Sequence, residues 1–108
     1  MQTRAAIVYT YGDPYQVERV ELDEPREREV LVRLAAAGIC HSDEHVRIGE
    51  MRAQLPLALG HEGAGVVERV GPGVTRCKPG DHIVFSFIPA CGHCRYCLMG
   101  LQSVRVAE

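Results

Sequence analysis

The sequence predicts a mainly β fold, an all-β barrel with little helix. Three observations support this prediction: several short apolar or alternating segments, glycine and proline turns between them, and only one short stretch with helix signals. The length of 108 residues suffices for one hydrophobic core and is too small for two. We therefore expect one domain, without internal repeats or linkers.

Five segments share the apolar or alternating pattern of short strands: 5–9, 15–22, 29–35, 65–70 and 82–87. The turns between the later strands are marked by Gly71-Pro72-Gly73 and by Lys78-Pro79-Gly80-Asp81. We expect loops around Pro56 and from Pro89 onward, because both regions lack a strand or helix pattern.

One short helix is expected between the third and fourth of these strands. Ser42 has the side chain of an N-cap, and the acids Asp43 and Glu44 follow in what would be the first turn. The pattern predicts a helix that begins near Ser42 and extends to Ile48.

Composition and charge exclude several classes of partner. Hydrophobic residues make up 46 % and charged residues 24 %, and the formal net charge is -2. Nucleic acids and anionic membranes favour a basic excess, so neither is an expected partner. No apolar run approaches the roughly 20 residues of a membrane helix. Because Met1-Gln2-Thr3-Arg4 begins no signal-peptide pattern, we expect a cytoplasmic protein.

The strongest chemical signal lies near the end of the chain. Three of the five cysteines are Cys91, Cys94 and Cys97, with two residues between each and the next. An odd count and this spacing favour metal ligation over disulfides. Zinc binds such thiolates in a tetrahedral set of four, so a fourth ligand is required and no cysteine follows Cys97.

An iron–sulfur cluster is the main competitor for this cysteine run. Bacterial ferredoxins use the same two gaps, followed by a cysteine four positions on and then a proline. Leu101 and Gln102 occupy those positions here, which favours zinc.

A second candidate site is formed by Cys40 and His61, which both lie beside glycines at apparent strand ends. Thiolate and imidazole are natural zinc ligands, although the pair alone is a weak signal. The glycines Gly60, Gly63 and Gly65 have the order G-x-x-G-x-G before a strand, which does not match the dinucleotide fingerprint.

Taken together, these residues resemble the zinc-dependent medium-chain alcohol dehydrogenases. Three stretches support the resemblance: 38–45, 60–67, and 78–81 leading into 91–97. The sequences of residues 40–45 and 86–91 are most similar to the actinobacterial nitrosoaniline-dependent branch. The resemblance implies a GroES-like irregular β-barrel with a short helix and a cysteine-rich zinc lobe.

The resemblance also implies two zinc sites. Cys40 and His61 match ligands of a catalytic zinc, and Glu62 matches the acid beside that metal. The cysteines of the 91–97 run match three of the four ligands of a structural zinc.

Further roles follow from the same resemblance. Ser42 and His45 match a proton relay that serves an alcohol or aldehyde substrate, and Asp43 matches a residue that orients the zinc-ligating histidine. His41 matches a position near the phosphates of the cofactor, NAD. The implied reaction is oxidation of an alcohol to an aldehyde or ketone by hydride transfer.

The sequence departs from the family pattern in three respects. Arg105 stands where the fourth structural cysteine is expected, and a guanidinium cannot replace a thiolate, so either His93 or His82 is the substitute or the lobe is half-formed. The third catalytic ligand and the cofactor-binding Rossmann domain are expected beyond residue 108. Residues 1–108 would then be a partial catalytic domain, inactive alone, from a truncated or frame-disrupted gene.

Two alternatives remain at this stage. The chain could be a free-standing zinc-binding β-barrel module without catalysis, or a GroES-like co-chaperone, which would leave the cysteine run unexplained. The full-length family is expected to form homo-oligomers.

Overall fold

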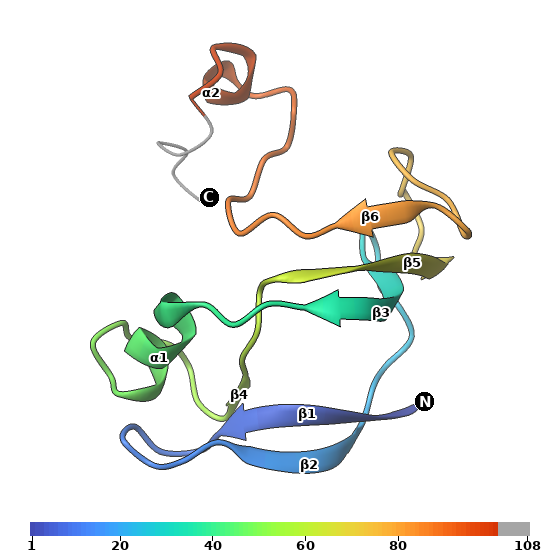
Figure 1. Ribbon diagram of the computed structural model, residues 1–108. Helices are drawn as coiled ribbons and strands as arrows, with labels where there is room; N and C mark the ends of the chain where they lie inside the picture. The colour runs from blue at the N-terminus through green and yellow to red at the C-terminus, as the bar shows by residue number, and fades with distance from the viewer. Residues whose placement is uncertain (102–108) are drawn as a thin grey trace.

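The computed structural model describes residues 1–101 and contains two three-stranded antiparallel sheets (Figure 1). The first sheet has the order β2-β1-β4, in which β1 (Gln2–Val8) pairs with β2 (Gln16–Glu21) along its length and with β4 (Leu57–Ala58) at its end. The strand pattern of 15–22 is confirmed, whereas the short β4 lies in the region around Pro56 that was predicted to be loop.

The second sheet has the order β3-β5-β6, formed by β3 (Val30–Ala37), β5 (Gly63–Val70) and β6 (His82–Val84). The strands β3 and β5 lie so close at Gly65 that a Cβ there would stand 2.2 Å from the carbonyl oxygen of Arg33. The absence of a side chain at Gly65 therefore permits this pairing.

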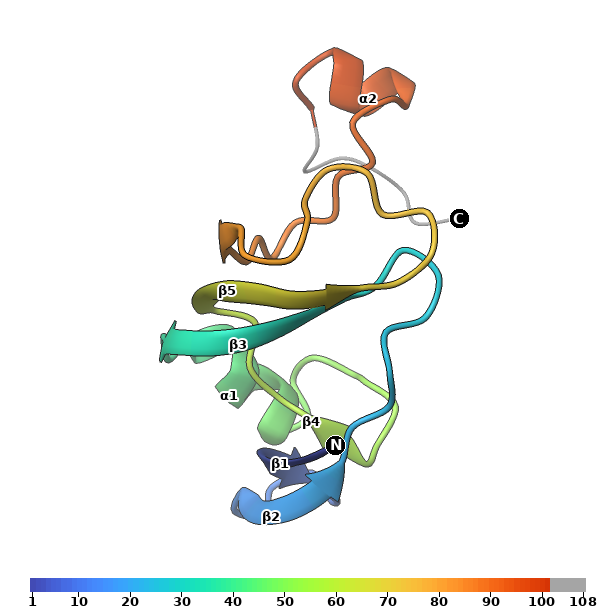
Figure 2. The same cartoon turned by 90° about the vertical axis from the view of Figure 1, so that its right-hand side faces the viewer.

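The two sheets form separate layers, and α1 (His41–Arg47) lies at one end between them (Figures 1 and 2). Ile7 and Val8 of β1 and Val67 of β5 are buried and form the core of the described residues. Ile39 and Val84 are among the large apolar side chains that stay exposed. The mainly β barrel architecture that the sequence predicts is confirmed.

The helices differ from the prediction at their ends. Cys40, with extended backbone angles and no side-chain cap bond, is the N-cap of α1, so the prediction that Ser42 caps this helix is wrong. The hydroxyl of Ser42 instead faces Cys40 and His61. A second short helix, α2 (Arg95–Leu98), forms where only loop was predicted, capped by the Cys94 sulfur that accepts from the Cys97 N–H.

The strand boundaries also shift by a few residues. β1 begins three residues earlier than predicted and ends at Val8, β3 continues to Ala37, and β5 begins at Gly63. β6 ends at Val84 rather than at Phe87, because the chain then turns away from β5 towards the lobe that contains α2 (Figure 1). None of the helices in the described part of the chain is long and apolar enough to cross a membrane.

Candidate metal sites

The structure brings Cys40, His61 and Glu62 together from separate elements. Cys40 precedes α1, and the other two residues precede β5; one ligand atom of each lies within 4.8 Å of those of the others. Thiolate, imidazole and carboxylate are all zinc ligands, so this set, termed the first group below, has the chemistry to hold a zinc ion. Three protein ligands are also the number typical of catalytic zinc sites.

Two polar neighbours orient the imidazole of this group. The Nδ1 of His61 lies 3.1 Å from Oδ1 of Asp43, which fixes the ring and leaves Nε2 on the side of the thiol. Ser42 Oγ lies 3.1 Å from Cys40 Sγ and 3.4 Å from His61 Nε2. A carboxylate behind a ligating imidazole is a recurrent feature of metal sites, because it sets the tautomer and raises the basicity of the ligand.

These contacts also change the ionisation of both ligands. Hydrogen bonds from the hydroxyl and the backbone of Ser42 lower the pKa of the Cys40 thiol. Desolvation alone would lower the pKa of His61, but hydrogen bonds with Asp43 and Cys40 outweigh it, and the pKa is raised. The result favours a Cys40 thiolate, which is the form that binds a metal.

A cleft of about 510 Å³ opens beside the first group. Its lining consists of the group, Ser42 and the segment that follows β6: Cys40, Ser42, His61, Glu62, Phe85, Ser86, Phe87 and Ile88. The ring of Phe87 lies 4.5 Å from the ring of His61 between centroids. A mostly apolar wall next to a few polar groups is the character of small-molecule sites.

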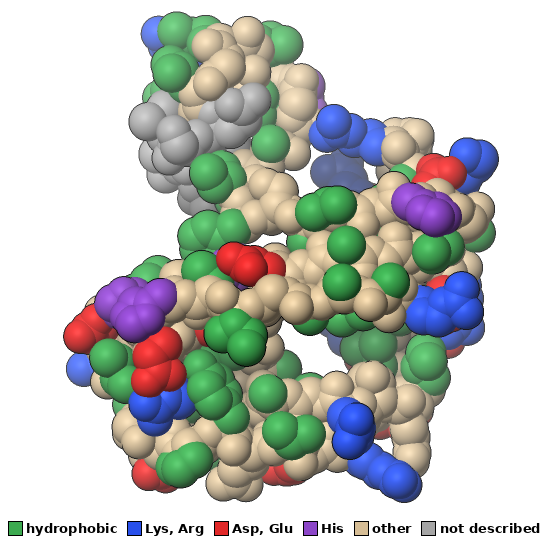
Figure 3. All heavy atoms as spheres, in the orientation of Figure 1, with side chains coloured by type: hydrophobic (Ala, Val, Ile, Leu, Met, Phe, Trp, Pro, Cys, Tyr) green, Lys and Arg blue, Asp and Glu red, His purple; other side chains and the backbone are tan. Residues whose placement is uncertain are grey.

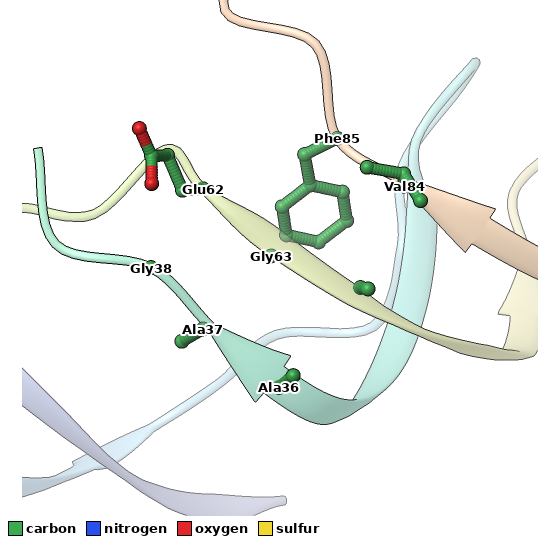
Figure 4. A pocket seen from close by; sticks show the side chains of 8 residues that line it. Ala36, Ala37, Gly38, Glu62, Gly63, Val84 and Phe85 are labelled. Atoms are coloured by element: carbon green, nitrogen blue, oxygen red, sulfur yellow. The ribbon is translucent and has the colours of Figure 1, made fainter.

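The side chain of Glu62 lies against the end of β3. Figure 4 shows its carboxylate beside Gly38, with the ring of Phe85 over Gly63 further along the same pocket. A Cβ at Gly38 would stand 2.0 Å from Oε2 of Glu62, so only glycine lets the carboxylate take this place. The glycine at position 38 thus serves the site as well as the strand end.

His41 and His45 both lie on α1, the helix that directly follows Cys40. Their rings are in edge-to-face contact with centroids 4.6 Å apart, and Nδ1 of His45 is paired with the carboxylate of Glu50. Arg47 anchors the helix by donating to the backbone oxygens of Gly12 and Asp13 at 3.1 and 3.0 Å. The histidine pair thus lies near Ser42 on a helix that is held in place.

Glu50 and Phe87 are site neighbours that sequence reasoning missed. Glu50 lies in the loop after α1, and Phe87 was predicted to be strand, so neither had a pattern that indicated the site. The five-residue spacing from His45 to Glu50 could have suggested a pair, since His45 lies in the last turn of α1 and Glu50 follows three residues after the helix ends.

The second group consists of Cys91, Cys94 and Cys97, termed the lobe cysteines below, whose sulfurs lie within 4.8 Å of one another. The sulfurs of Cys91 and Cys97 are 3.9 Å apart. Zn–S bonds of about 2.3 Å at tetrahedral angles give sulfurs separated by about 3.8 Å. The spacing of this pair thus fits a common metal ion.

The lobe holds its sulfurs through local hydrogen bonds. The backbone N–H of Cys94 donates to Cys91 Sγ at 3.2 Å, and that of Cys97 donates to Cys94 Sγ at 3.5 Å. Backbone donors at His93 and Cys94 lower the pKa of Cys91 to about 6. The backbone N–H of Cys97 is the largest single influence on the pKa of Cys94 and lowers it, but the thiols of Cys97 and Cys91 together with desolvation outweigh the lowering contributions, and the pKa is raised.

The structure does not place either predicted substitute ligand with the lobe cysteines. The group of ligand atoms includes neither His93 nor His82; Nδ1 of His93 lies 3.2 Å from the carbonyl oxygen of Cys91, and His82 is an exposed residue of β6. Of the two alternatives, the geometry of the described residues favours a lobe with three ligands over a lobe that either histidine completes. Arg105, where the family pattern has a cysteine, lies outside the described residues.

A strand barrel with a Cys–His–Glu group and a three-cysteine lobe has the layout of a zinc-binding dehydrogenase domain. The chain belongs to the alcohol dehydrogenase GroES-like domain family, which matches residues 26–107.

Individual proteins agree with this assignment. The chain is 56 % identical over 104 residues to an NDMA-dependent alcohol dehydrogenase of Amycolatopsis methanolica, covering 96 % of this chain and 28 % of that protein. It is also similar to the solved structure of an alcohol dehydrogenase zinc-binding domain protein from Burkholderia ambifaria, with a TM-score of 0.84 and 46 % identity. The matched region covers 93 % of this chain and 27 % of that protein.

A further solved structure is a cobalt- and zinc-bound thermostable alcohol dehydrogenase from Pyrobaculum aerophilum. Its TM-score to this chain is 0.84 at 39 % identity, and the matched region covers 95 % of this chain and 32 % of that protein. The chain therefore spans less than a third of the length of these relatives. The resemblance to the nitrosoaniline-dependent branch and to zinc alcohol dehydrogenases is confirmed.

Proposed function

We propose that residues 1–108 are part of the catalytic domain of a zinc-dependent alcohol dehydrogenase that oxidises an alcohol to an aldehyde or ketone with hydride transfer to NAD. The observation that carries the proposal is the first group, in which Cys40, His61 and Glu62 offer three ligand atoms within 4.8 Å beside a cleft. Asp43 behind His61 supports the same function, because it is the type of contact that metal-ligating histidines make.

The residues of the first group fit zinc in number and in kind. When bound there, zinc would supply Lewis-acid chemistry, which lowers the pKa of a hydroxyl group. Ser42 is proposed to accept the proton that such a hydroxyl loses while it passes its own proton on. This role is supported by the position of its Oγ beside two of the atoms that would hold the zinc, 3.1 Å from Cys40 Sγ and 3.4 Å from His61 Nε2.

His45 is proposed as the next proton carrier. It lies three residues after Ser42, about one turn along α1, and its side chain is 38 % exposed to solvent. Glu50 is paired with Nδ1, so Nε2 remains as the atom that takes up or releases a proton. The exposed end of this path gives the proton an exit to water.

His41, also on α1, is proposed to contact the phosphates of NAD, whose main binding site we place outside residues 1–108. The isolated chain is therefore expected to show no alcohol turnover with added NAD. A downstream ligand that would join Cys40 and His61 on the catalytic zinc, with Glu62 as the acid beside the metal, stays a prediction. A homo-oligomer of the full-length protein and a cytoplasmic address are further parts of the proposal that stay predictions.

The test uses the full chain with Cys94→Ser, which silences the lobe so that metal binds only at the first group. Loaded with Co²⁺, this variant should show thiolate-to-cobalt and d–d absorption bands, which disappear when His61→Asn is added. A short-chain primary alcohol should shift the d–d bands, because the cleft lets a hydroxyl reach the metal.

Two results would contradict the proposal. Cobalt bands that survive His61→Asn would place the metal elsewhere, and cobalt bands that no alcohol shifts would favour the free-standing zinc-binding module. Turnover by the isolated chain with added NAD would contradict only the placement of the cofactor site outside residues 1–108.

A further inference from the structure

Two histidines of α1 form a cluster that is separate from the first group and from the lobe cysteines. His41 is the first residue of α1 and His45 follows four residues later, so the two lie on one face of the helix. Their rings are in edge-to-face contact, with centroids 4.6 Å apart and an angle of 84° between the ring planes. Neither histidine belongs to the two groups of metal-binding side chains in residues 1–101.

The geometry of the pair suits the binding of one metal ion by both rings. Helical histidines four residues apart are a zinc-binding pattern, because both imidazoles point to the same side of the helix. A metal–nitrogen bond of about 2.0 Å puts the ring centre about 3.2 Å from the metal, so two rings at bond angles of about 90° to 110° have centroids about 4.5 to 5.2 Å apart. The distance of 4.6 Å between the rings of His41 and His45 lies within this range.

Glu50 prepares His45 for this role. Its carboxylate is paired with Nδ1 of His45, so Nδ1 carries the hydrogen and Nε2 keeps a free lone pair. A carboxylate behind a metal-binding imidazole is a recurrent feature of metal sites, because it fixes the tautomer and the orientation of the ring. The negative charge of Glu50 also favours a cation close to the pair.

The histidine pair is open to solvent. His41 and Glu50 are exposed, and the side chain of His45 is 38 % exposed. Figure 3 shows histidine side chains on the surface at α1, with acidic side chains next to them. An ion from solution therefore reaches both rings without a rearrangement of the fold, and water fills its remaining coordination positions.

We propose that His41 and His45 form a third metal site, which binds a divalent transition-metal ion such as Ni²⁺ or Zn²⁺ at the surface of α1. Imidazole is a ligand that both ions accept. Because the site offers two imidazoles and no thiolate, it binds zinc more weakly than the two cysteine-containing groups and fills after them. The metal binding does not depend on alcohol oxidation. Its consequence, that an ion there takes both imidazoles away from proton transfer and from the NAD phosphates, rests on the proposed function.

The test uses the full chain without an affinity tag, loaded with zinc at the cysteine-containing groups and then titrated with Ni²⁺. Native mass spectrometry counts the added ions, and NMR spectra of the imidazole nitrogens show which histidines the paramagnetic Ni²⁺ broadens. The expected result is one Ni²⁺ per chain beyond the zinc. The signals of His41 and His45 should broaden first, while those of His82 and of the lobe stay unchanged.

Matched histidine variants test the pair. His41→Gln and His45→Gln should each weaken Ni²⁺ binding at least tenfold, because one imidazole alone is left to hold the ion. His82→Gln is the control, because His82 is an exposed histidine of β6 that lies in neither group of metal-binding side chains. Its titration should be the same as that of the parent. Glu50→Gln should weaken binding severalfold, because the amide no longer fixes the tautomer of His45.

Two outcomes would overturn the inference. Equal Ni²⁺ affinities of the parent and of His41→Gln would mean that the two rings do not share the ion; His41 is exposed, so this variant keeps the fold intact. Broadening of His61 before His41 and His45 would place the ion at the first group. A chain that takes up no zinc before the titration contradicts the proposed function alone, because the histidine pair contains no cysteine and its NMR signals are still read separately.

Discussion

The first group and the lobe cysteines are built in opposite ways. Cys40 and His61 come from separate segments, and they meet only because β3 pairs with β5 and α1 lies at the end of that pair. The lobe cysteines lie within seven residues and are held by hydrogen bonds that stay inside the segment. One site thus depends on the tertiary fold, and the other depends on a local turn and a short helix.

This difference predicts that the two metal sites fail independently. A change that separates β3 from β5 should remove metal from the first group alone, whereas a change in the lobe backbone should affect only the lobe. Because energetic effects of distant, unconnected sites generally add, the two sites also serve as internal controls for each other.

The largest effect is expected from Gly65→Val. A Cβ at this position stands 2.2 Å from the carbonyl oxygen of Arg33, so the strands must separate. We expect a loss of about 3 kcal/mol in the free energy of unfolding. His61 directly precedes β5, so the metal content should fall from two ions per chain to one, measured by native mass spectrometry.

Gly80→Val is the control for this prediction, because no atom lies within 4 Å of a Cβ there and the position is in a turn outside the strands. It carries backbone strain without strand separation, so both metals should remain. Loss of the lobe metal in Gly65→Val would show that the lobe depends on the strand layers after all.

The next effect is expected from Asp43→Asn. The carboxylate of Asp43 holds Nδ1 of His61 at 3.1 Å, and loss of such an orienting contact costs about 10- to 100-fold in metal affinity. Competition with a chromophoric chelator should show this loss at the first group only. Asp81→Asn is the control, because the Asp81 carboxylate accepts a hydrogen bond from Lys78 in a turn, and this variant should leave both metal affinities unchanged. Equal losses in the two variants would contradict the role of Asp43.

The same comparison explains what the sequence could predict. The spacing of the lobe cysteines is a local pattern, so it indicated the lobe directly. The strands were largely predictable, because β-branched residues and alternation determine them, whereas β4 depends on pairing with β1 and has only two residues. The short α2 was missed, because its cap is the sulfur of Cys94 rather than a residue that normally indicates a helix start.

The first group is less visible in the sequence, because its members are far apart along the chain. Cys40 and His61 alone formed a weak pattern, and the family resemblance was needed to join them. The contact between Glu62 and Gly38 and the cleft wall at Phe87 depend on how the sheet and the segment after β6 are arranged in space. The role of Ser42 was likewise hidden, because its local pattern is that of a helix cap, whereas its hydroxyl faces Cys40 and the distant His61.

A smaller effect is expected from Gly92→Ala in the lobe. The backbone of Gly92 has φ +83°, in the left-handed region, where a side chain costs about 1–2 kcal/mol. The lobe should therefore bind its metal about tenfold more weakly, since about 1.4 kcal/mol corresponds to a factor of ten. Gly12→Ala carries a similar strain at φ +88° in the turn after β1, and it should lower the melting temperature without changing either metal affinity.

The smallest effect concerns the pH dependence of stability through α1, the helix of the first group. Hydrogen bonds from Arg47 hold the pKa of Glu44 below its ordinary value of about 4.3. A carboxyl whose pKa is lower in the folded state stabilises it above the unfolded pKa, and this contribution is lost as the pH falls through the folded pKa. Unfolding curves of the chain and of Glu44→Gln should therefore differ at pH 7 and converge in acid. A difference in the free energy of unfolding that stays constant with pH would show that Glu44 acts by packing alone. The metal affinity of the lobe should be the same in Glu44→Gln at pH 7, because α1 lies in a separate part of the fold.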